Sequence, residues 1–475
     1  MQFKQKFCSV RRPLVAAALL ALLLGGCAVG PDYQRPGMQE VLAFKEAEGW
    51  VSAAPADMLD RGPWWQLFDD PVLTGLASRL DISNQTVAAA VAAYAQARAA
   101  VREQQAGLFP VVTLNSGANR SHSSTSAAGS SGRTGNNYQV SIGSSWEPDV
   151  WGRLGRAVDS ASASAQASEA DLASARLSAQ GELAVNYLTL RQLDAQKVLL
   201  ETTLAGFQRT LDITQNRYIA GIAAKTDVLQ AQTQLANSQA DVAGLTRQRA
   251  QLEHAIAVLV GDAPGNFSLL PTAWNPFVPD VPTGIASELL QRRPDIAAAE
   301  RGVALANEQI GIAKSAYFPS LSLGTSYGLG ASRVADLFSA PSSVWSLGLS
   351  AAQSLFNAGA TTARVEGREA AHAQAVARYR RTVLIAFQGV EDQLAAAQAL
   401  LVQQGLRRQA SDAADQVEQQ VLNRYRSGQV GYTEVVTAQA TALNARRALV
   451  QTLADRQTTT VALIQSLGGG WQASR

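Results

Sequence analysis

Cysteine is nearly absent from this chain, with only Cys8 and Cys27 among 475 residues. Residues 1–26 have the organisation of an export signal, with four basic residues, an apolar run at 14–24 and small residues before Cys27. Cleavage of this signal removes Cys8 and leaves Cys27 alone. The mature chain is therefore expected to have no intramolecular disulfide bond.

An excess of basic charge is also absent. The basic residues of the signal leave with it, so that Lys+Arg falls from 40 to 36 against 38 Asp+Glu, a formal charge near −2. This balance provides no basic surface for nucleic acid, and we expect no nucleic-acid partner.

Histidine is equally scarce, and the sequence has no catalytic motif. His122, His254 and His372 are the only histidines, and they lie far apart without the spacing of metal ligands. No nucleophile elbow, phosphate loop or paired-cysteine motif occurs. We therefore expect no metal site, no cofactor and no enzyme activity.

Long apolar runs and prolines are missing from most of the chain. Beyond the signal, no apolar run approaches the roughly 18–20 residues that a membrane helix requires. No proline occurs between Pro148 and Pro264 or after Pro341. Because a helix interior tolerates proline poorly, both stretches are predicted to be helical. Prolines gather instead at 264–282, which we interpret as part of a linker at 264–291.

What the chain does contain is a long internal repeat. The sequence NRYIAG at 216–221 returns as NRYRSG at 423–428, and LFP at 108–110 returns as YFP at 317–319. A repeat of this length indicates a duplicated domain rather than a solenoid. We predict the first repeat at 83–263 and the second at 292–470, preceded by a segment at 27–82 and followed by a tail at 471–475.

Each proline-free stretch has apolar residues at helical spacing. In the first repeat they step by four and three, the spacing of a coiled-coil seam: Leu200, Leu204, Phe207, Leu211, Thr214 and Tyr218. A helix over 156–220 would be on the order of 100 Å long at about 1.5 Å per residue. This is about three times a bilayer core, so the helix must stand in water.

The remaining helices follow from the repeat. Gly221 and Gly428 are predicted to end the long helices, with returning helices at 225–260 and 432–467. Shorter helices are predicted at 83–106 and 295–316.

Between the short and the long helix, each repeat has the alternating pattern of strands. We predict strands at 111–119, 138–146, 320–329 and 345–350, joined by polar connections at 120–137 and 330–343. Strands of this length cross an outer membrane at a tilt. Four strands are too few to close a barrel, and an open edge facing lipid leaves backbone groups unpaired. The chain must therefore oligomerise; a trimer is consistent with the geometry, which leaves other numbers open.

Four short motifs occur in order along the chain: CAVGPDY at 27–33, WW at 64–65 with FDDP at 68–71, RRPDI at 292–296 and LGGGW at 467–471. With the duplication, they make the chain resemble the outer-membrane efflux proteins of the TolC type, in the lipoprotein branch of OprM-like, NodT-type outer-membrane factors. The resemblance covers essentially the whole mature chain. It implies a mainly α fold with a membrane part, in which a trimeric α-helical barrel is continued by a twelve-strand outer-membrane β-barrel.

The same resemblance implies the outer-membrane channel of a tripartite efflux system. Such a channel is a passive duct through which an inner-membrane transporter and a periplasmic adaptor pass drugs or other small toxic compounds to the exterior. The resemblance also implies that residues 24–27 form a lipobox, with Cys27 acylated and anchored in the outer membrane because Ala28 follows it. The segment at 27–82 would then pack around the equator of the helices. An ordinary signal peptide with an incidental cysteine is the alternative.

The resemblance places a gate near the start of the returning helices. Asp227 and Glu434 occupy equivalent positions there, and a ring of such carboxylates would favour cations. Alternatively, each is a solvated acid stabilised by the helix dipole. Tyr425 looks like the family tyrosine that latches the closed state, although it could equally pack the helix pair. Thr437 stands where some relatives have a second aspartate.

The ends of the long helices are, by the same resemblance, the docking site for the adaptor. The residues concerned are Arg217 and Gly221 in the first repeat and Arg424 and Gly428 in the second. Plain helix turns are the alternative.

Other classes of function remain open. The outlet of a type I protein-secretion system shares this fold, since its cargo is chosen by its partners. A structural periplasmic lipoprotein would explain the helices but not the alternating strands. A lipid-anchored enzyme would need a catalytic constellation, which the sequence does not have.

Overall fold

The computed structural model describes residues 28–37, 45, 63–123, 133–281, 293–339 and 342–469. The predicted signal, Cys27, most of 38–62 and the tail at 471–475 lie outside the described residues. The chain divides into two compact units, each drawn from both repeats. The strand unit comprises Met1–Gly37, Tyr94–Ser168 and Ala299–Tyr379, and the tip unit comprises Met38–Ala93, Glu169–Ala298 and Arg380–Arg475.

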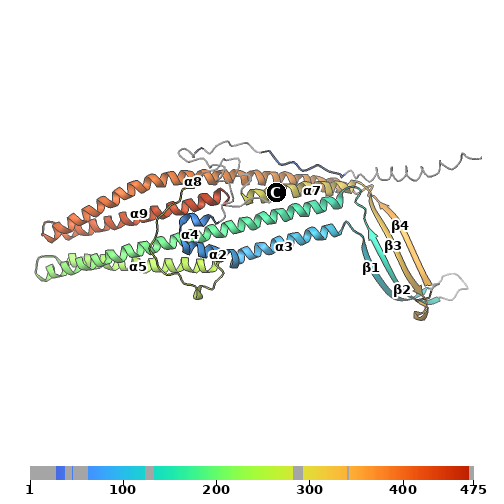
Figure 1. Ribbon diagram of the computed structural model, residues 1–475, viewed down its shortest axis with the longest axis horizontal. Coiled ribbons are helices and arrows are strands. Elements are labelled where there is room, and N and C mark those ends of the chain that lie inside the picture. Colours follow the sequence, from blue (N-terminus) through green and yellow to red (C-terminus); the bar gives the residue numbers. More distant parts are fainter. Residues whose placement is uncertain are drawn as a thin grey trace, which may run out of the picture. The chain divides into compact units, whose positions relative to one another are not determined.

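The elements follow one order twice (Figure 1). The first repeat contains α3 (Gln85–Ala106), β1 (Val111–Ser123), β2 (Arg133–Trp146), α4 (Arg153–Ile219) and α5 (Lys225–Leu259). The second contains α7 (Pro294–Lys314), β3 (Ser320–Ala331), β4 (Ser343–Ala352), α8 (Ala360–Arg426) and α9 (Tyr432–Ser466). Helices α4 and α8 have 67 residues each, and α5 and α9 have 35 each. The predicted fold class, mainly helical with strands and a duplicated unit, is confirmed.

Shorter elements lie outside the two series. They are η2 (Trp64–Phe68), α2 (Pro71–Ser83), η3 (Pro264–Asn266), η5 (Ser315–Tyr317) and η6 (Val334–Asp336). Among the described residues, no helix is both long enough and apolar enough to cross a membrane.

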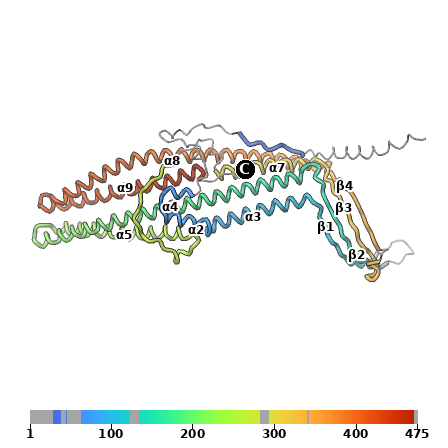
Figure 2. The backbone as a smooth tube through the Cα atoms, in the orientation of Figure 1, coloured from blue at the N-terminus to red at the C-terminus, as the bar shows by residue number. Residues whose placement is uncertain are grey.

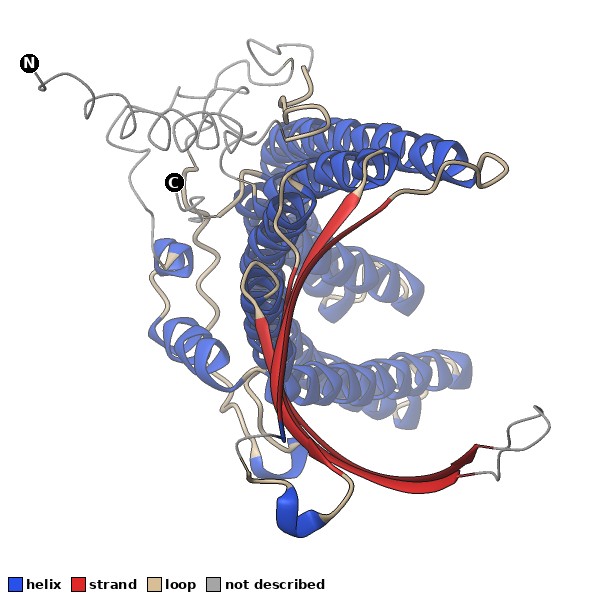
Figure 3. Cartoon of the chain, turned by 90° about the vertical axis from the view of Figure 1, so that its right-hand side faces the viewer, coloured by secondary structure: helices blue, strands red, loops and turns tan. Residues whose placement is uncertain are grey.

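The strands of the strand unit form one antiparallel sheet in the order β1-β2-β3-β4, which curves strongly (Figure 3). Its middle pair joins the two repeats, with Ile142 opposite Tyr327. Within the described residues, the outer edges of β1 and β4 have no strand partner. Large apolar side chains on the sheet are exposed, among them Leu114 at 75% and Leu349 at 70%.

The strands are longer than the alternating pattern predicted. β1 continues to Ser123 and β2 begins at Arg133, so that much of the expected connection at 120–137 is paired strand, with Asn119 opposite Asn137. Similarly, β3 extends to Ala331. Backbone pairing between strands needs no apolar side chain, and so these ends were not visible in the apolar pattern.

The CAVGPDY motif holds the start of the described chain within the strand unit. The Val29 N–H donates to the Trp151 carbonyl at 3.1 Å, and the Tyr33 hydroxyl donates to Glu300 at 2.8 Å. Gly30 has a φ of +122°, and a Cβ there would lie 2.6 Å from Gly311 Cα. Only glycine allows so close an approach of two backbones.

The WW and FDDP motifs form part of the core of the tip unit. Trp64, Trp65 and Phe68 are all buried in it. Asp70 caps α2 by accepting from the Val72 N–H at 2.9 Å, and its other oxygen accepts from the Tyr187 hydroxyl of α4 at 2.7 Å. One carboxylate therefore both starts α2 and ties it to the long helix.

The RRPDI motif has a similar structural use. Arg293 donates to both carboxylate oxygens of Asp295, at 3.0 and 2.8 Å. It also donates to the carbonyl of Ser466, the last residue of α9, at 2.8 Å. A bidentate arginine thus satisfies a carbonyl at a helix end that would otherwise lack a partner.

The seam of α4 differs from the predicted one. Its buried residues recur with a heptad spacing: Leu200, Thr203, Phe207, Thr210 and Thr214. Each of the three threonine hydroxyls donates to the carbonyl four residues earlier, which leaves the methyl group for packing. Tyr218, expected in the seam, is 42% exposed. Thr214 was expected in the seam, whereas apolar spacing missed Thr203 and Thr210 because it counts them as polar.

A buried ion network joins α4 to α5 and to the chain that follows them. Arg191 and Asp194 are each 4% exposed, and Arg249 is 13% exposed. Asp194 accepts from Arg191 at 3.1 Å and from Arg249 at 2.7 Å. Arg191 also donates to the Leu270 carbonyl at 2.8 Å. Asp194 therefore pairs with both guanidinium groups, and Glu253 pairs with Arg249 as well, at 2.9 Å.

Replacing this aspartate with its uncharged isostere should destabilise the protein strongly. Asp194→Asn leaves Arg191 buried without a counter-charge, while Arg249 keeps its ion pair with Glu253 at 2.9 Å, and the expected loss is about 3–5 kcal/mol of unfolding free energy. Guanidinium-induced unfolding followed by circular dichroism measures this loss. The control is Glu201→Gln, which breaks an exposed pair with Lys197 at 3.8 Å and should cost under about 1 kcal/mol. Equal effects of the two substitutions would contradict a structural role for the network.

Candidate functional site

Within the tip unit, the long helices reverse direction at two turns, which lie at the same end of the unit (Figure 2). We call α4 with α5 the first hairpin and α8 with α9 the second hairpin. In the first turn Gly221 has a φ of +74°, its N–H donates to the Tyr218 carbonyl, and the Ile222 N–H donates to the Arg217 carbonyl. In the second turn Gly428 has a φ of +76°, with the equivalent bonds from Gly428 to Tyr425 and from Gln429 to Arg424. Both are Schellman turns, in which glycine adopts the left-handed conformation and the last carbonyls are satisfied.

Tyr425 is the centre of the contact between the two hairpins. It is 3% exposed, and its hydroxyl lies 3.1 Å from Thr214 Oγ1. Arg217 of the first hairpin donates to the Tyr425 carbonyl at 2.8 Å, and its guanidinium lies over the Tyr425 ring, 4.6 Å from the centroid. The Tyr432 ring meets the Tyr425 ring edge to face at 5.8 Å. Tyr425 thus makes polar contacts between helices and also packs the helix pair.

Around this tyrosine lies a small apolar core, which we call the tip cluster. Its buried members come from both hairpins: Leu211, Val228, Ala231, Tyr425, Tyr432 and Val435. Packing of these side chains holds the ends of the two hairpins against each other, with the hydrogen bonds of Tyr425 fixing their register.

The predicted gate carboxylates occupy matching positions but different surroundings. Asp227 is the third residue of α5 and Glu434 the third residue of α9, each in the first turn. Both therefore lie at the positive end of a helix dipole. Asp227 is half-buried, whereas Glu434 is exposed. Glu434 lines a groove of about 380 Å³ between α8 and α9, together with Val417, Val421 and Thr437.

The charge of Asp227 in the first hairpin affects the pKa of Tyr432 in the second hairpin. The pKa of Tyr432 is raised to about 12, chiefly by burial and then by the nearby Tyr425 and the charge of Asp227. Sequence reasoning missed Tyr432 and Thr214 as members of this site. The residue of the first repeat that is equivalent to Tyr432 is Lys225. Comparing the sequences of the two hairpins therefore gave no indication that Tyr432 packs against a second aromatic ring.

The predicted docking residues differ in whether their side chains or backbone are free to contact a partner protein. Gly221 and Gly428 are exposed at the turns, whereas Arg217 is occupied by Tyr425. Arg424 is exposed, and among the described residues its side chain has no hydrogen bond or ion pair. The structure therefore brings Arg217 and Tyr425 together but leaves Arg424 apart.

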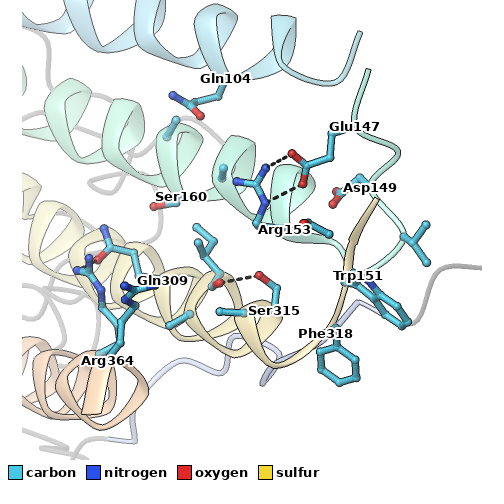
Figure 4. Close-up of a pocket in the computed structure, with 18 of the residues that line it drawn as sticks. Gln104, Glu147, Asp149, Trp151, Arg153, Ser160, Gln309, Ser315, Phe318 and Arg364 are labelled. Carbon is cyan, nitrogen blue, oxygen red and sulfur yellow. Dashed lines mark hydrogen bonds and ion pairs between the residues drawn. The ribbon is translucent and has the colours of Figure 1, made fainter. Parts of the chain in front are cut away.

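The strand unit holds a separate cavity of about 810 Å³, near the start of α4 (Figure 4). Its acidic residues are engaged in structure: Glu147 accepts from Arg153 at 3.1 and 2.7 Å, and Asp149 accepts from the N–H groups of Leu154 and Gly155. Trp151 stacks on Phe318 at 4.8 Å beside it. These contacts fix the first turn of α4. In the part of the chain that the structure describes, no cluster of His, Cys, Asp or Glu side chains is arranged to hold a metal ion.

Known proteins with similar sequences and structures share this architecture. The family model described as outer membrane efflux protein matches residues 76–262 and 285–469, once for each repeat. TtgC of Pseudomonas putida, a probable efflux pump outer membrane protein, is 30% identical over 466 residues, which are 97% of this chain and 96% of TtgC. OpmQ of Pseudomonas aeruginosa, a pyoverdine export outer membrane protein, is 31% identical over 465 residues, 96% of each chain. The solved structure of the outer-membrane channel OprN is 30% identical and aligns with a TM-score of 0.88 over 94% of this chain and 100% of OprN.

Truncating the tyrosine at the centre of the tip cluster should loosen both turns. Tyr425→Ala removes a buried ring with an expected cost of about 3–5 kcal/mol. Hydrogen exchange of amides near the two turns should accelerate accordingly. Tyr425→Phe is the matched control, because it keeps the ring and removes only the hydroxyl, with an expected cost of about 1 kcal/mol. If the two variants exchange alike, the ring does not hold the hairpins together.

The contact should also weaken in strong base. The pKa of Tyr432 is about 12 in the folded chain against an ordinary value of 10.0, so the folded state holds the proton more tightly. Its contribution to stability is complete below pH 10.0 and is lost as the pH rises towards 12. NMR of ring-labelled tyrosine, with Tyr432→Phe to assign the signal, measures this pKa. Asp227→Asn should lower it, and no change would contradict the proximity of the carboxylate.

Proposed function

The chain belongs to the outer membrane efflux protein family, and on this premise we propose that three copies form a passive duct across the outer membrane. Its relatives are outer-membrane components of efflux pumps, and it functions as such a component. The main observation that supports a three-copy duct is the structure of the sheet. β1 and β4 each have an outer edge without a strand partner among the described residues, and the sheet has exposed apolar side chains.

An unpaired edge in lipid costs several kcal/mol for each backbone group. The edge strand β4 of one copy therefore pairs with β1 of the next, and the assembly has no edge once the ring closes. Three copies of a four-stranded sheet give twelve strands, within the range of outer-membrane barrels. The water-filled continuation is built from α4, α5, α8 and α9 of each copy, since these helices are mostly polar on their outer surfaces.

Acylation of Cys27 anchors each copy to the same membrane. Supporting this, the residues that directly follow Cys27 are fixed within the strand unit, where Val29 binds the Trp151 carbonyl and Ala28 packs against Gly152. These contacts lie at the start of α4, which directly follows β2 in the strand unit. Cys27 itself lies outside the described residues.

The cargo is small molecules, delivered by an inner-membrane transporter through a periplasmic adaptor. TtgC and OpmQ are named for an efflux pump and for pyoverdine export, which supports small cargo over the proteins of a type I secretion outlet. The duct performs no catalysis, and its energy comes from the transporter. Exposed apolar residues at the first turn, Ile219 at 76% and Ile222 at 67%, support adaptor docking at the turns with Arg424 and the two glycines.

Asp227, Glu434 and Tyr425 form the gate of this duct. Three copies would bring six carboxylates to the ends of the hairpins, and such a ring favours cations over anions. Tyr425 holds the two hairpins of one copy together and so limits how far the entrance widens.

Loss of the duct should sensitise the cell to toxic compounds. Deleting the gene should lower the minimal inhibitory concentration of several unrelated small compounds, and the parent gene should restore it. The purified protein should run as a heat-modifiable trimer in detergent and conduct ions in planar bilayers. A stable monomer that passes no ions would overturn the duct, and unchanged susceptibility with loss of a secreted protein would favour the type I outlet.

A further inference from the structure

The two faces of the sheet differ in chemistry. Because side chains alternate along a strand, Leu347 and Leu349 of β4 share one face, and Ser346 and Ser350 share the other. The polar face has a shallow hollow of about 520 Å³, lined mainly by serine, threonine and glycine. In the proposed duct the apolar face meets lipid, so the polar face lines the path of the cargo.

The cavity of about 810 Å³ lies where this polar face ends, next to the helices. Ser320 and Ala352, which face each other at the ends of β3 and β4, belong to its lining. Ser322 and Ser350, the next pair on the same face, line the hollow. The helices α3, α4 and α7 provide mostly apolar walls: Ala97, Ala100, Ala157, Ala161, Leu305 and Ile312. The volume is within the range of about 300–1,000 Å³ of sites for small molecules.

Two arginines of α8 give the cavity a positive wall. The two acids of the lining are already bound, to Arg153 and to N–H groups of α4. Arg368 donates to the Gln309 amide oxygen at 2.7 Å, and the side chain of Arg364 has no hydrogen bond or ion pair among the described residues. Residues four apart share one face of a helix. Figure 4 shows Arg364 on the opposite side of the cavity from the pair of Glu147 with Arg153.

We propose that this cavity binds organic carboxylates with an apolar body as they pass through the duct. The carboxylate accepts from the guanidinium groups of Arg364 and Arg368, which suit the two oxygens of such a group. The apolar body lies against the alanine and leucine walls of α3, α4 and α7. This site rests on the proposed function and adds a chemical class to its cargo.

Binding at this site is weak, as a passage requires. Both arginines are exposed, so water and salt screen their charge. A ligand on a conducting path must bind well enough to enter and weakly enough to leave. The gate carboxylates Asp227 and Glu434 belong to the tip unit, whereas the cavity belongs to the strand unit. The preference of the cavity for anions can therefore be tested without altering the proposed gate.

Removal of the two positive charges tests the recognition of the carboxylate. The probe is naphthoate, with naphthamide as its uncharged analogue, and equilibrium dialysis measures binding to the full-length acylated protein in lipid nanodiscs. Arg364→Gln with Arg368→Gln should raise the dissociation constant of naphthoate about five- to tenfold, the effect of losing two exposed ion pairs. Naphthamide should bind weakly and equally to parent and variant. Raising the salt from about 0.1 M to about 1 M should weaken the binding of naphthoate to the parent.

The matched control removes the same charge elsewhere on the same helix. Arg407→Gln with Arg408→Gln changes two exposed arginines of α8 outside the cavity and should leave the binding of naphthoate unchanged. Equal binding of naphthoate by the parent and the Arg364 and Arg368 double variant would overturn the site. Conductance in planar bilayers tests the duct separately. Conductance without this binding would leave the duct and remove the site, and binding without conductance would do the reverse.

Filling the cavity tests its apolar walls. Ala161→Leu places a larger side chain in the cavity and should raise the dissociation constant of naphthoate about three- to tenfold, because the ring loses apolar surface to pack against. Ala99→Leu, at an exposed position of α3 outside the cavity, is the control and should have no effect. Circular dichroism checks that both variants are folded. Unchanged affinity in folded Ala161→Leu protein would show that naphthoate binds elsewhere and would overturn the proposal.

Discussion

Backbone hydrogen bonding at the edges of the sheet is the constraint on which the rest of the structure depends. β1 and β4 present rows of N–H and C=O groups that, among the described residues, no strand satisfies, and hydrocarbon offers no water to replace a partner. The duplication supplies the means to meet this constraint. Because β2 of the first repeat pairs with β3 of the second, each copy presents one β1 edge and one β4 edge, which are complementary to each other. In the proposed ring of copies, every β1 edge would be paired with a β4 edge.

The same duplication sets up the contacts at the turns, where the two repeats have diverged. Arg217 and Tyr425 bind each other within a chain, while the equivalent Arg424 and Tyr218 remain exposed. Thr214 offers Tyr425 a hydroxyl at 3.1 Å and the Tyr432 ring packs against it at 5.8 Å, whereas the equivalent residues of the repeat are Val421 and Lys225. The two repeats therefore share their helices and turns, but only one of the two equivalent tyrosines is the centre of a buried contact.

The sequence predicted the elements well because their signals are local. Proline-free stretches, alternation and the glycines at 221 and 428 each depend on a few neighbouring residues, and the helices and turns lie where these signals placed them. The seam threonines Thr203 and Thr210 were missed because the polarity of a threonine hydroxyl is satisfied in a helix by a bond to the carbonyl four residues earlier, which apolar spacing does not take into account. The contact at the centre of the site could not be predicted from local sequence patterns. Thr214 meets Tyr425 across 211 residues of sequence, and no spacing rule contains that contact.

The turns themselves are poor candidates for the moving part. Each glycine adopts the left-handed conformation without strain, and the carbonyls at both helix ends are satisfied by the Schellman bonds. Unwinding a turn would therefore expose polar groups and gain no freedom that the rest of the hairpin could use. The tip cluster adds a buried core shared by both hairpins of a copy. The Schellman turns and the tip cluster therefore hold the ends of the two hairpins of one chain together as a single packed group.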